Sequence, residues 1–262
     1  MPLTVATWNV NGIRARQAQF LEWLGRDRPD VVCLQEIKAT PAQLEDTLCS
    51  LDGYYCYWHG AGPYSGVSLN LRRDTFPEEP KYSHPAFDRE TRIVTAESGD
   101  LVFASIYVPN GGKDFAAKME FLHELERWAG RLTAEGKRLV LSGDMNVTRT
   151  DQDVHPKERK PLIIGQRPEE RQVFERLLAH GLVDVGRALD PENNDLFTWW
   201  APWRNMRQRN IGWRIDYILA SESLAKTATE SKVLADVGTS DHAPVMARFG
   251  DAKTETGAVS RP

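Results

Sequence analysis

The stretch Gly143-Asp144-Met145-Asn146 follows the apolar run Leu139-Val140-Leu141 and places a carboxylate where a buried strand leaves its sheet. Glu36 is placed in the same way after Val31-Val32-Cys33-Leu34, and Ser240-Asp241-His242 adds a third acid near the C-terminus. Strand ends form the edge at which α/β folds bind ligands. Carboxylates gathered there without an equal number of cations repel one another. The pattern therefore predicts a divalent metal with oxygen ligands, magnesium or manganese, and metal-assisted phosphate chemistry.

The composition indicates one large domain. At 262 residues with 41% hydrophobic content, the chain can bury a sizeable core, and it shows no Gly/Ser-rich or Pro-rich linker, internal repeat or 18-residue apolar run. We expect a single catalytic domain over residues 1–250 and a polar, disordered tail over 251–262. No signal-peptide pattern is present, which favours a cytoplasmic protein. The cysteines lack Cys-x-x-Cys spacing, which favours reduced, buried thiols: Cys33, Cys49 and Cys56.

Apolar patterning predicts more strands than helices. Strands are expected at residues 4–8, 31–34, 54–58, 67–71, 93–96, 102–108, 139–142, 217–220 and 245–249. Amphipathic patterns predict helices around residues 20–24, over about 114–133, and from Pro168 to just before Gly181. Because some neighbouring strands look like hairpins, we expect two mixed β-sheets packed face to face with helices outside, and not a simple Rossmann sheet.

Local charge is more informative than the formal net charge of −4. Between residues 203 and 215, Trp203 and Trp213 are interleaved with arginines and no acid is present. Arginine grips phosphate at two points, and an aromatic ring stacks on a base or fills a gap in a duplex. A solvated loop anchored by tryptophans is the alternative. The arginines are Arg204, Arg207, Arg209 and Arg214, and a second basic stretch contains Lys157, Arg159 and Lys160.

Histidine is the second chemical clue. We pair Asp216 with His242, because a buried aspartate that accepts the imidazole hydrogen bond raises the imidazole pKa. The imidazolium could then donate to a phosphoryl oxygen. The other histidines have no comparable acidic neighbour in the sequence and are expected to be solvated or structural: His59, His84, His123, His155 and His180.

With these motifs, the chain resembles the exonuclease III class of AP endonucleases within the endonuclease/exonuclease/phosphatase superfamily. The resemblance covers nearly the whole chain, with the motifs in the family's order. They are Trp8-Asn9-Val10-Asn11-Gly12-Ile13-Arg14-Ala15, Leu34-Gln35-Glu36-Ile37-Lys38, Tyr64-Ser65-Gly66-Val67, Tyr107-Val108-Pro109-Asn110-Gly111, Gly143-Asp144-Met145-Asn146-Val147, Gly212-Trp213-Arg214-Ile215-Asp216-Tyr217 and Ser240-Asp241-His242-Ala243-Pro244.

The resemblance implies a four-layered αβ-sandwich that cuts DNA on the 5′ side of an abasic site and leaves a 3′-OH, as in base excision repair. It also implies 3′–5′ exonuclease and 3′-end-cleaning activities. Glu36 would bind Mg²⁺, for which Mn²⁺ can substitute, with Asn9, Asn11 and Asp241 around the ion. Asn11 stands where many family members have Asp. The implied catalytic residues are Asp144 and Asn146 for the water and the phosphate, His242 held by Asp216 for the phosphoryl oxygens, and Tyr107 with Asn110 to complete the grip.

The implied partner is double-stranded DNA containing abasic sites, bound by a monomer. Trp199, Trp213 and Ile215 would form an apolar niche that admits a deoxyribose without its base, and Trp203 would act as a wedge beside Arg204 and Arg207. The alternative is a Mg²⁺-dependent phosphodiesterase or phosphatase of the same superfamily acting on a non-DNA or undamaged substrate. A catalytically dead DNA-damage binding module would need a broken set of motifs.

Overall fold

The fold is two six-stranded mixed sheets packed face to face, described for residues 2–250 of a computed structural model. The first sheet has the order β11-β12-β1-β2-β4-β3 and contains β1 (Leu3–Asn9), β2 (Val31–Gln35), β3 (Tyr54–His59), β4 (Val67–Arg72), β11 (Ala228–Val233) and β12 (Val245–Phe249). The second has the order β5-β6-β7-β8-β10-β9 and contains β5 (Lys81–Ser83), β6 (Ile93–Ser98), β7 (Leu101–Tyr107), β8 (Arg138–Asp144), β9 (Leu182–Asp184) and β10 (Asp216–Ser221). The tail expected over residues 251–262 lies outside the described residues.

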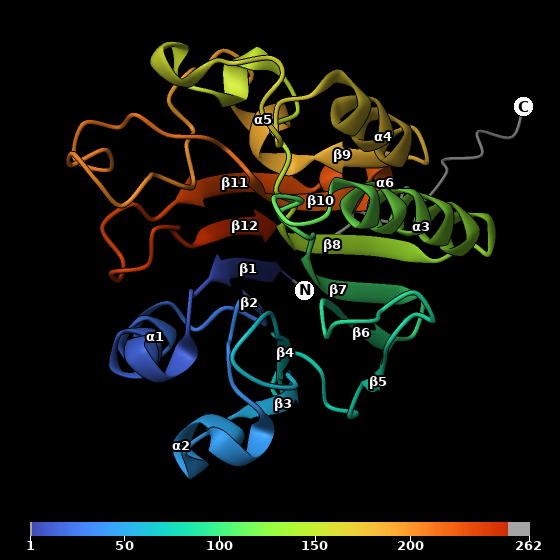
Figure 1. The fold of residues 1–262 in the computed structure, drawn as a ribbon. Helices are drawn as coiled ribbons and strands as arrows, with labels where there is room; N and C mark the ends of the chain where they lie inside the picture. The colour runs from blue at the N-terminus through green and yellow to red at the C-terminus, as the bar shows by residue number, and fades with distance from the viewer. Residues whose placement is uncertain (1, 251–262) are drawn as a thin grey trace, which may run out of the picture.

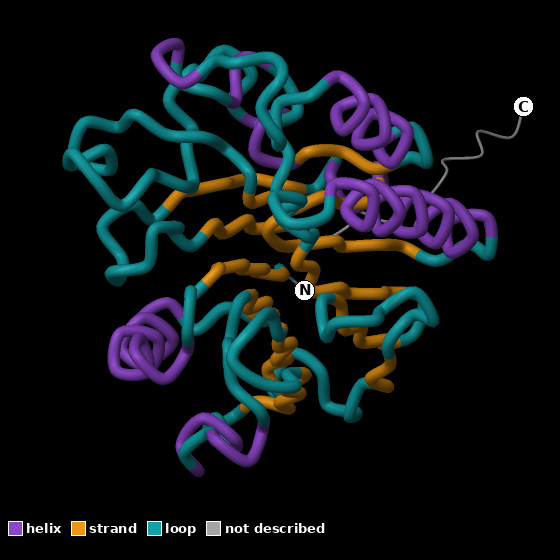
Figure 2. Tube along the Cα trace, viewed as in Figure 1, coloured by secondary structure: helices purple, strands orange, loops and turns teal. Residues whose placement is uncertain are grey.

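Helices cover the outer face of each sheet, so the molecule has four layers (Figure 1). The helices are α1 (Ile13–Asp27), α2 (Asp46–Cys49), α3 (Phe115–Ala134), α4 (Pro168–Leu178), α5 (Val185–Leu189) and α6 (Glu222–Ala225), with 3₁₀ turns at Pro41–Gln43, Asp151–Asp153 and Pro156–Glu158. Figure 2 shows the strands in the middle of the molecule, with α1 and α2 on one outer side and α3 and α4 on the other. Among residues 2–250, no helix has the length and apolar character needed to cross a bilayer.

Three apolar clusters hold the layers together. One fills the space between the sheets with residues such as Val31, Phe103 and Ile218. A second packs α1 and α2 on the first sheet, and a third packs α3 and α4 on the second. The four-layered sandwich predicted from the sequence is therefore confirmed.

The predicted strands are all present, with ends within two residues of those expected. The sequence reading missed β5, β9 and β11, which are all edge strands. An edge strand has one side open to solvent, so its apolar signal is weak. The three cysteines are free, as expected, although Cys49 and Cys56 are only partly buried.

Two β-α-β units position the site. The strands β1 and β2 are parallel, as are β7 and β8, and each pair is joined through a helix, α1 or α3. The carboxyl ends of β1 and β2 therefore lie at one edge of the first sheet, and those of β7 and β8 at one edge of the second, with Tyr107 opposite Asp144. A hydrogen bond from Asn9 to Asp144 brings the two edges together. Gly143 adopts φ 152°, and a Cβ there would overlap the carbonyl oxygen of Ile106. The close approach of β7 and β8 just before Asp144 thus requires glycine.

Candidate active site

Three side chains from both sheets converge at this edge. Glu36 follows β2, Asp144 ends β8, and His242 precedes β12. One ligand atom from each lies within 4.8 Å of the other two. Asn9 connects the carboxylates, because its Nδ2 donates to Glu36 Oε1 and Asp144 Oδ2, each at 2.9 Å. We call Glu36, Asp144 and His242 the inner cluster.

The histidine of the inner cluster is a cation at neutral pH. His242 Nδ1 lies 2.9 Å from Asp216 Oδ2, which is the pairing predicted from the sequence. Burial alone would lower the pKa of His242, but the charge and hydrogen bond of Asp216, together with Asp144, raise it to about 10. Thr198, which the sequence reading missed, fixes Asp216 by donating to its Oδ2 at 2.6 Å.

The two carboxylates of the inner cluster are unequal. Burial, with the nearby charges of Asp216 and Glu36, raises the pKa of Asp144 to about 7 against the opposing effect of His242. Burial also acts to raise the pKa of Glu36, but hydrogen bonds from Asn9 and Lys38 lower it overall. Glu36 is therefore ionised at neutral pH, whereas Asp144 is poised to gain or lose a proton.

Lys38 gives Glu36 a neighbouring cation. Its Nζ lies 2.7 Å from Glu36 Oε2 and donates to Asn11 Oδ1 at 2.6 Å, and the acids of the site still outnumber the cations, as the sequence pattern implied. Lys38 neutralises only Glu36, and His242 is already paired with Asp216. Carboxylate oxygens of Glu36 and Asp144 beside a polar cleft still suit a hard divalent cation, so the donor set fits the metal that this chemistry requires.

The other predicted metal ligands lie beside the inner cluster. Asn11 Nδ2 donates to Asp241 Oδ1 at 2.8 Å, and Asn11 N donates to Asn9 Oδ1 at 3.0 Å. Asp241 Oδ2 accepts from Trp199 Nε1 at 3.0 Å. In this arrangement Asn9 turns its amide group toward the carboxylates, and the polar groups of Asn11 are already engaged.

The predicted phosphate-binding residues meet around Asn146. Asn146 Nδ2 donates to the carbonyl oxygen of Val108 at 2.9 Å, and Asn110 Nδ2 donates to Asn146 Oδ1 at 3.5 Å. Tyr107 ends β7 nearby, and burial and the negative charges of Glu36 and Asp144 raise its pKa. The phenol therefore stays protonated and can donate a hydrogen bond.

A buried lysine that the sequence reading missed supports Asn146. Lys118 of α3 is fully buried, lies 2.5 Å from Glu170 Oε1, and donates to the carbonyl of Asn146 at 2.7 Å. The apolar stripe of α3 concealed it. Only its position beside Met119 and Leu122, on the inward side of that helix, could have pointed to burial.

The aromatic residues form one wall next to His242. Trp199 and Trp213 pack edge to face with ring centroids 5.4 Å apart, and Trp199 makes a β-bridge with His242. Ile215 is buried behind them. Trp203, in the loop beyond Trp199, is 60% exposed, which is unusual for a tryptophan.

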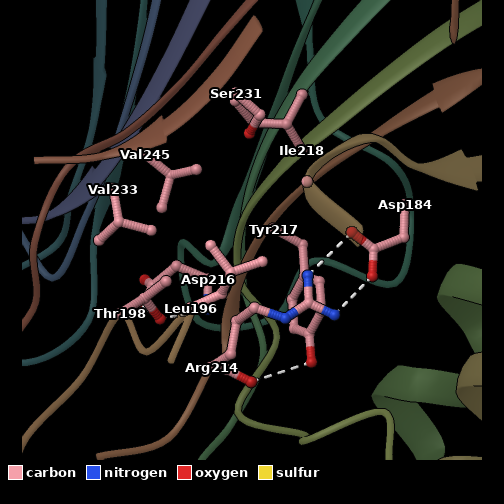
Figure 3. Close-up of a pocket in the computed structure, with 11 residues that line it drawn as sticks. Asp184, Leu196, Thr198, Arg214, Asp216, Tyr217, Ile218, Ser231, Val233 and Val245 are labelled. Atoms are coloured by element: carbon pink, nitrogen blue, oxygen red, sulfur yellow. Dashed lines mark hydrogen bonds and ion pairs between the residues drawn. The ribbon is translucent and has the colours of Figure 1, made fainter. Parts of the chain in front are cut away.

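The arginines do not share one role. Arg204 is exposed, whereas Arg207 donates to the carbonyls of Ala235, Val237 and Ser240 and so holds a loop. Arg214 was grouped with them as a phosphate binder, but it is buried 2.7 Å from Asp153. It also lies 2.6 Å from Asp184 (Figure 3). That reading is wrong for Arg214, because burial and two acidic partners commit its charge to the fold.

Figure 3 also shows the cavity behind Asp216. It measures about 20 Å³, which is room for a single water molecule, and Thr198 and Arg214 are among its lining residues. A much larger cleft of about 1010 Å³ opens in front of the inner cluster and is lined by Glu36, Lys38, Tyr107 and Asn110. The cleft continues along the segment between β5 and β6.

Two of the other histidines have acidic partners that the sequence does not reveal. His59 Nε2 lies 2.6 Å from Asp88, and His180 Nε2 lies 2.5 Å from Glu126. Both partners are distant in sequence, by 29 and 54 positions, so a search for local acids could not find them.

Paired carboxylates beside an imidazolium, next to a large cleft that Glu36 lines, are the arrangement of a metal-assisted phosphodiesterase. The comparisons with known proteins agree. The chain belongs to the endonuclease/exonuclease/phosphatase family, whose model matches residues 6–242. It is an enzyme of the exonuclease III and AP endonuclease type.

Two relatives illustrate the match. An exodeoxyribonuclease of Bacillus subtilis is 31% identical over 253 residues, which cover 93% of this chain and 98% of that protein. Recombination repair protein 1 of Drosophila melanogaster is 33% identical over 255 residues and covers 94% of this chain. The chain spans only 37% of the length of the Drosophila protein.

Solved structures give the same picture. A 3′ phosphatase from Neisseria bound to a product DNA hairpin is 29% identical, with a TM-score of 0.86 over 95% of this chain and all of that chain. An AP endonuclease from Archaeoglobus fulgidus is 27% identical, with a TM-score of 0.85 and the same coverage of both chains.

Proposed function

We propose that the protein is a Mg²⁺-dependent DNA repair nuclease that hydrolyses the phosphodiester on the 5′ side of an abasic site and leaves a 3′-OH. The same site would remove nucleotides or blocking groups from 3′ ends. The substrate is double-stranded DNA containing abasic sites, bound by a monomer in base excision repair, and Mn²⁺ substitutes for Mg²⁺. Glu36 would hold the ion, supported by Asn9, Asn11 and Asp241.

The bound ion would supply positive charge to the phosphoryl and leaving oxygens. Asp144, with its pKa raised to about 7, accepts a proton from the attacking water. His242, kept protonated by Asp216, donates a hydrogen bond to a phosphoryl oxygen as negative charge builds there. Tyr107, Asn110 and Asn146 hold the remaining oxygens, and Lys118 keeps Asn146 in place.

The observation that carries the choice of substrate is the aromatic wall beside His242. Trp199 and Trp213 pack at 5.4 Å next to the residue that would contact the scissile phosphate. Such a wall favours a sugar without a base, because a flipped normal nucleotide would lose its stacking at a cost of a few kcal/mol and then clash. The exposed Trp203 is suited to fill the gap left in the duplex.

A second candidate shares the same chemistry. The similarity to a Neisseria 3′ phosphatase at a TM-score of 0.86 favours an enzyme that works mainly on 3′ ends. More distant still is a Mg²⁺-dependent phosphodiesterase or phosphatase that acts on an undamaged or non-DNA substrate. These candidates differ in how the loops accept a strand end or a continuous duplex.

The test is cleavage of a labelled duplex with one synthetic abasic site, in Mg²⁺ and in EDTA. Two further duplexes carry a recessed undamaged 3′ end and a 3′-phosphate. We expect Mg²⁺-dependent incision at the abasic site at a higher kcat/KM than on either 3′ end. Dominant release of phosphate or nucleotides would favour the second candidate, and no cleavage of any duplex would contradict a DNA substrate.

A further inference from the structure

A second cluster of metal-ligating side chains lies at the outer edges of the two sheets. His59 is the last residue of β3, which is the edge strand of the first sheet. His84 directly follows β5, the edge strand of the second sheet, and Asp88 lies in the segment between β5 and β6. We call these three residues the outer cluster. It connects two sheets that share no hydrogen-bonded strand pair among residues 2–250.

The side chains of the outer cluster already converge. One ligand atom from each lies within 4.8 Å of the other two. His59 Nε2 lies 2.6 Å from Asp88 Oδ2, and the imidazole rings of His59 and His84 stack with centroids 3.8 Å apart. Binding of one ion by all three would require the two imidazole rings to rotate out of their stack, so that the donors reach the ~2.0–2.2 Å bond lengths of zinc.

Neighbouring groups orient this donor set. Asp88 has a side chain only 2% exposed, and its Oδ1 accepts from Arg92 N at 2.8 Å, which leaves Oδ2 directed at the histidines. Tyr57 OH lies 2.9 Å from His84 Nε2 and fixes that ring. Supporting hydrogen bonds of this kind are what hold metal ligands in position. Partial burial and the adjacent His59 lower the pKa of His84.

We infer that the outer cluster is a binding site for a divalent transition metal of the zinc class, held by His59, His84 and Asp88 with water as the fourth ligand. Imidazole nitrogens select zinc-class ions over magnesium, and one carboxylate with two imidazoles is an ordinary donor set for such an ion. The exposure of His84 leaves room for the water ligand.

The bound metal would fix one wall of the cleft. Asp88 holds Arg92 through its main chain, and the Arg92 guanidinium lies 4.8 Å from the ring centroid of Tyr107. The adjoining residues Phe87 and Thr91 line the cleft. A metal that joins β3 to this segment would therefore hold the cleft wall beside Tyr107 without taking part in the chemistry.

The experiment titrates the full chain, stripped with EDTA and dialysed, with ZnCl₂ alone, and measures bound zinc by equilibrium dialysis and elemental analysis. Wild type is compared with His84→Ala, Asp88→Asn and Glu36→Gln. His123→Ala is the matched control, because that histidine is also partly exposed, its ring is hydrogen-bonded to Arg176, and it belongs to neither cluster. A second titration with Co²⁺ reads the coordination from visible absorption.

We expect wild type, His123→Ala and Glu36→Gln each to bind zinc at the outer cluster with the same affinity. His84→Ala and Asp88→Asn should weaken it at least ~10-fold, the scale at which even supporting residues affect metal affinity. Zinc should also slow amide exchange over residues 85–92 in wild type and not in His84→Ala. Three outcomes would overturn the proposal. Wild type could fail to bind zinc, His84→Ala could bind zinc as wild type does, or only Glu36→Gln could lose zinc binding. If circular dichroism shows that a variant is unfolded, His59→Gln takes its place under the same criteria.

Discussion

The inner and outer clusters have the same residue types and opposite electrostatics. The inner cluster has one histidine and two carboxylates, the outer cluster has two histidines and one carboxylate, and each joins the first sheet to the second. The inner cluster lies at the ends of central strands, where Asp144 and His242 are at most 4% exposed. The outer cluster lies on edge strands, where His84 is open to solvent.

The difference lies in what surrounds each histidine. His242 faces Asp216 and Asp144, and these charges raise its pKa to about 10, so it presents protons to an anion. His84 stacks on another histidine, and its pKa is lowered, so it presents a lone pair to a cation. Residue type alone therefore does not tell a phosphate-binding histidine from a metal-binding one. The surrounding charges separate His242 from His84, although His59 of the outer cluster also has a carboxylate beside it in Asp88.

The largest expected effect comes from the matched substitutions Asp144→Asn and Asp88→Asn. We expect Asp144→Asn to lower kcat by at least ~10³-fold, because general-base catalysis alone contributes 10²–10⁴-fold. Asp88→Asn should leave kcat within about 3-fold in Mg²⁺. Single-turnover cleavage of abasic duplex measures both. Equal losses would show that the outer cluster takes part in the chemistry.

The Asp144→Asn substitution should also raise the melting temperature at pH 8. The pKa of Asp144 is raised on folding, so its ionisation opposes folding as the pH rises through about 7. Asparagine removes that penalty. A lower melting temperature at pH 8 would contradict the raised pKa.

The second effect tests what makes His242 a cation. Asp216→Asn removes the largest of the charges that raise the pKa of His242, and burial continues to lower it. We expect kcat to fall on the order of 10²-fold at pH 7.5, with the alkaline limb of the pH–rate profile moved to lower pH. His84→Asn should leave the profile unchanged. A loss of rate with an unmoved alkaline limb would mean that Asp216 only positions the ring.

The sequence revealed the inner cluster more fully than the outer one, for a physical reason. Glu36 and Asp144 each follow a long apolar run, because central strands are buried on both faces and their ends are sharply marked. The Asp216–His242 pair could be proposed because both residues adjoin such strands. His59 and His84 adjoin edge strands, and β5, only three residues long, was not predicted.

The same reasoning explains the arginine error. Arg204 and Arg214 lie in one basic stretch, but one is exposed and the other is enclosed by Asp153 and Asp184. Those acids come from the 3₁₀ turn Asp151–Asp153 and from β9, two elements without a strong sequence signal. Local charge in a sequence therefore predicts a binding surface only when the tertiary partners are also known.

The third effect separates binding from chemistry. Trp203 belongs to neither cluster and is 60% exposed. We expect Trp203→Ala to weaken the binding of abasic duplex by ~1–3 kcal/mol, the range for a stacked aromatic contact, or about 5- to 150-fold in Kd. Single-turnover cleavage at saturating enzyme should be unchanged. An equal loss in both measurements would refute a wedge role and place Trp203 in the catalytic step.

The smallest effect is a pH dependence of stability that should have opposite signs in the two clusters. The pKa of His242 is raised, so its contribution to stability is complete below the unfolded value near 6.5 and is lost as the pH rises toward 10. The pKa of His84 is lowered, so its contribution is complete above pH 6.5 and is lost as the pH falls below that value.

The contribution of His84 can be measured by denaturant unfolding in EDTA at pH 7.5 and pH 5.5, for wild type and His84→Asn. Wild type should lose more free energy of unfolding between these pH values than His84→Asn, by less than about 1 kcal/mol, because solvent screens an exposed side chain. A difference of the opposite sign would mean that protonated His84 gains more from Asp88 than it loses to His59, and the outer cluster would then be an ion pair, not a metal site.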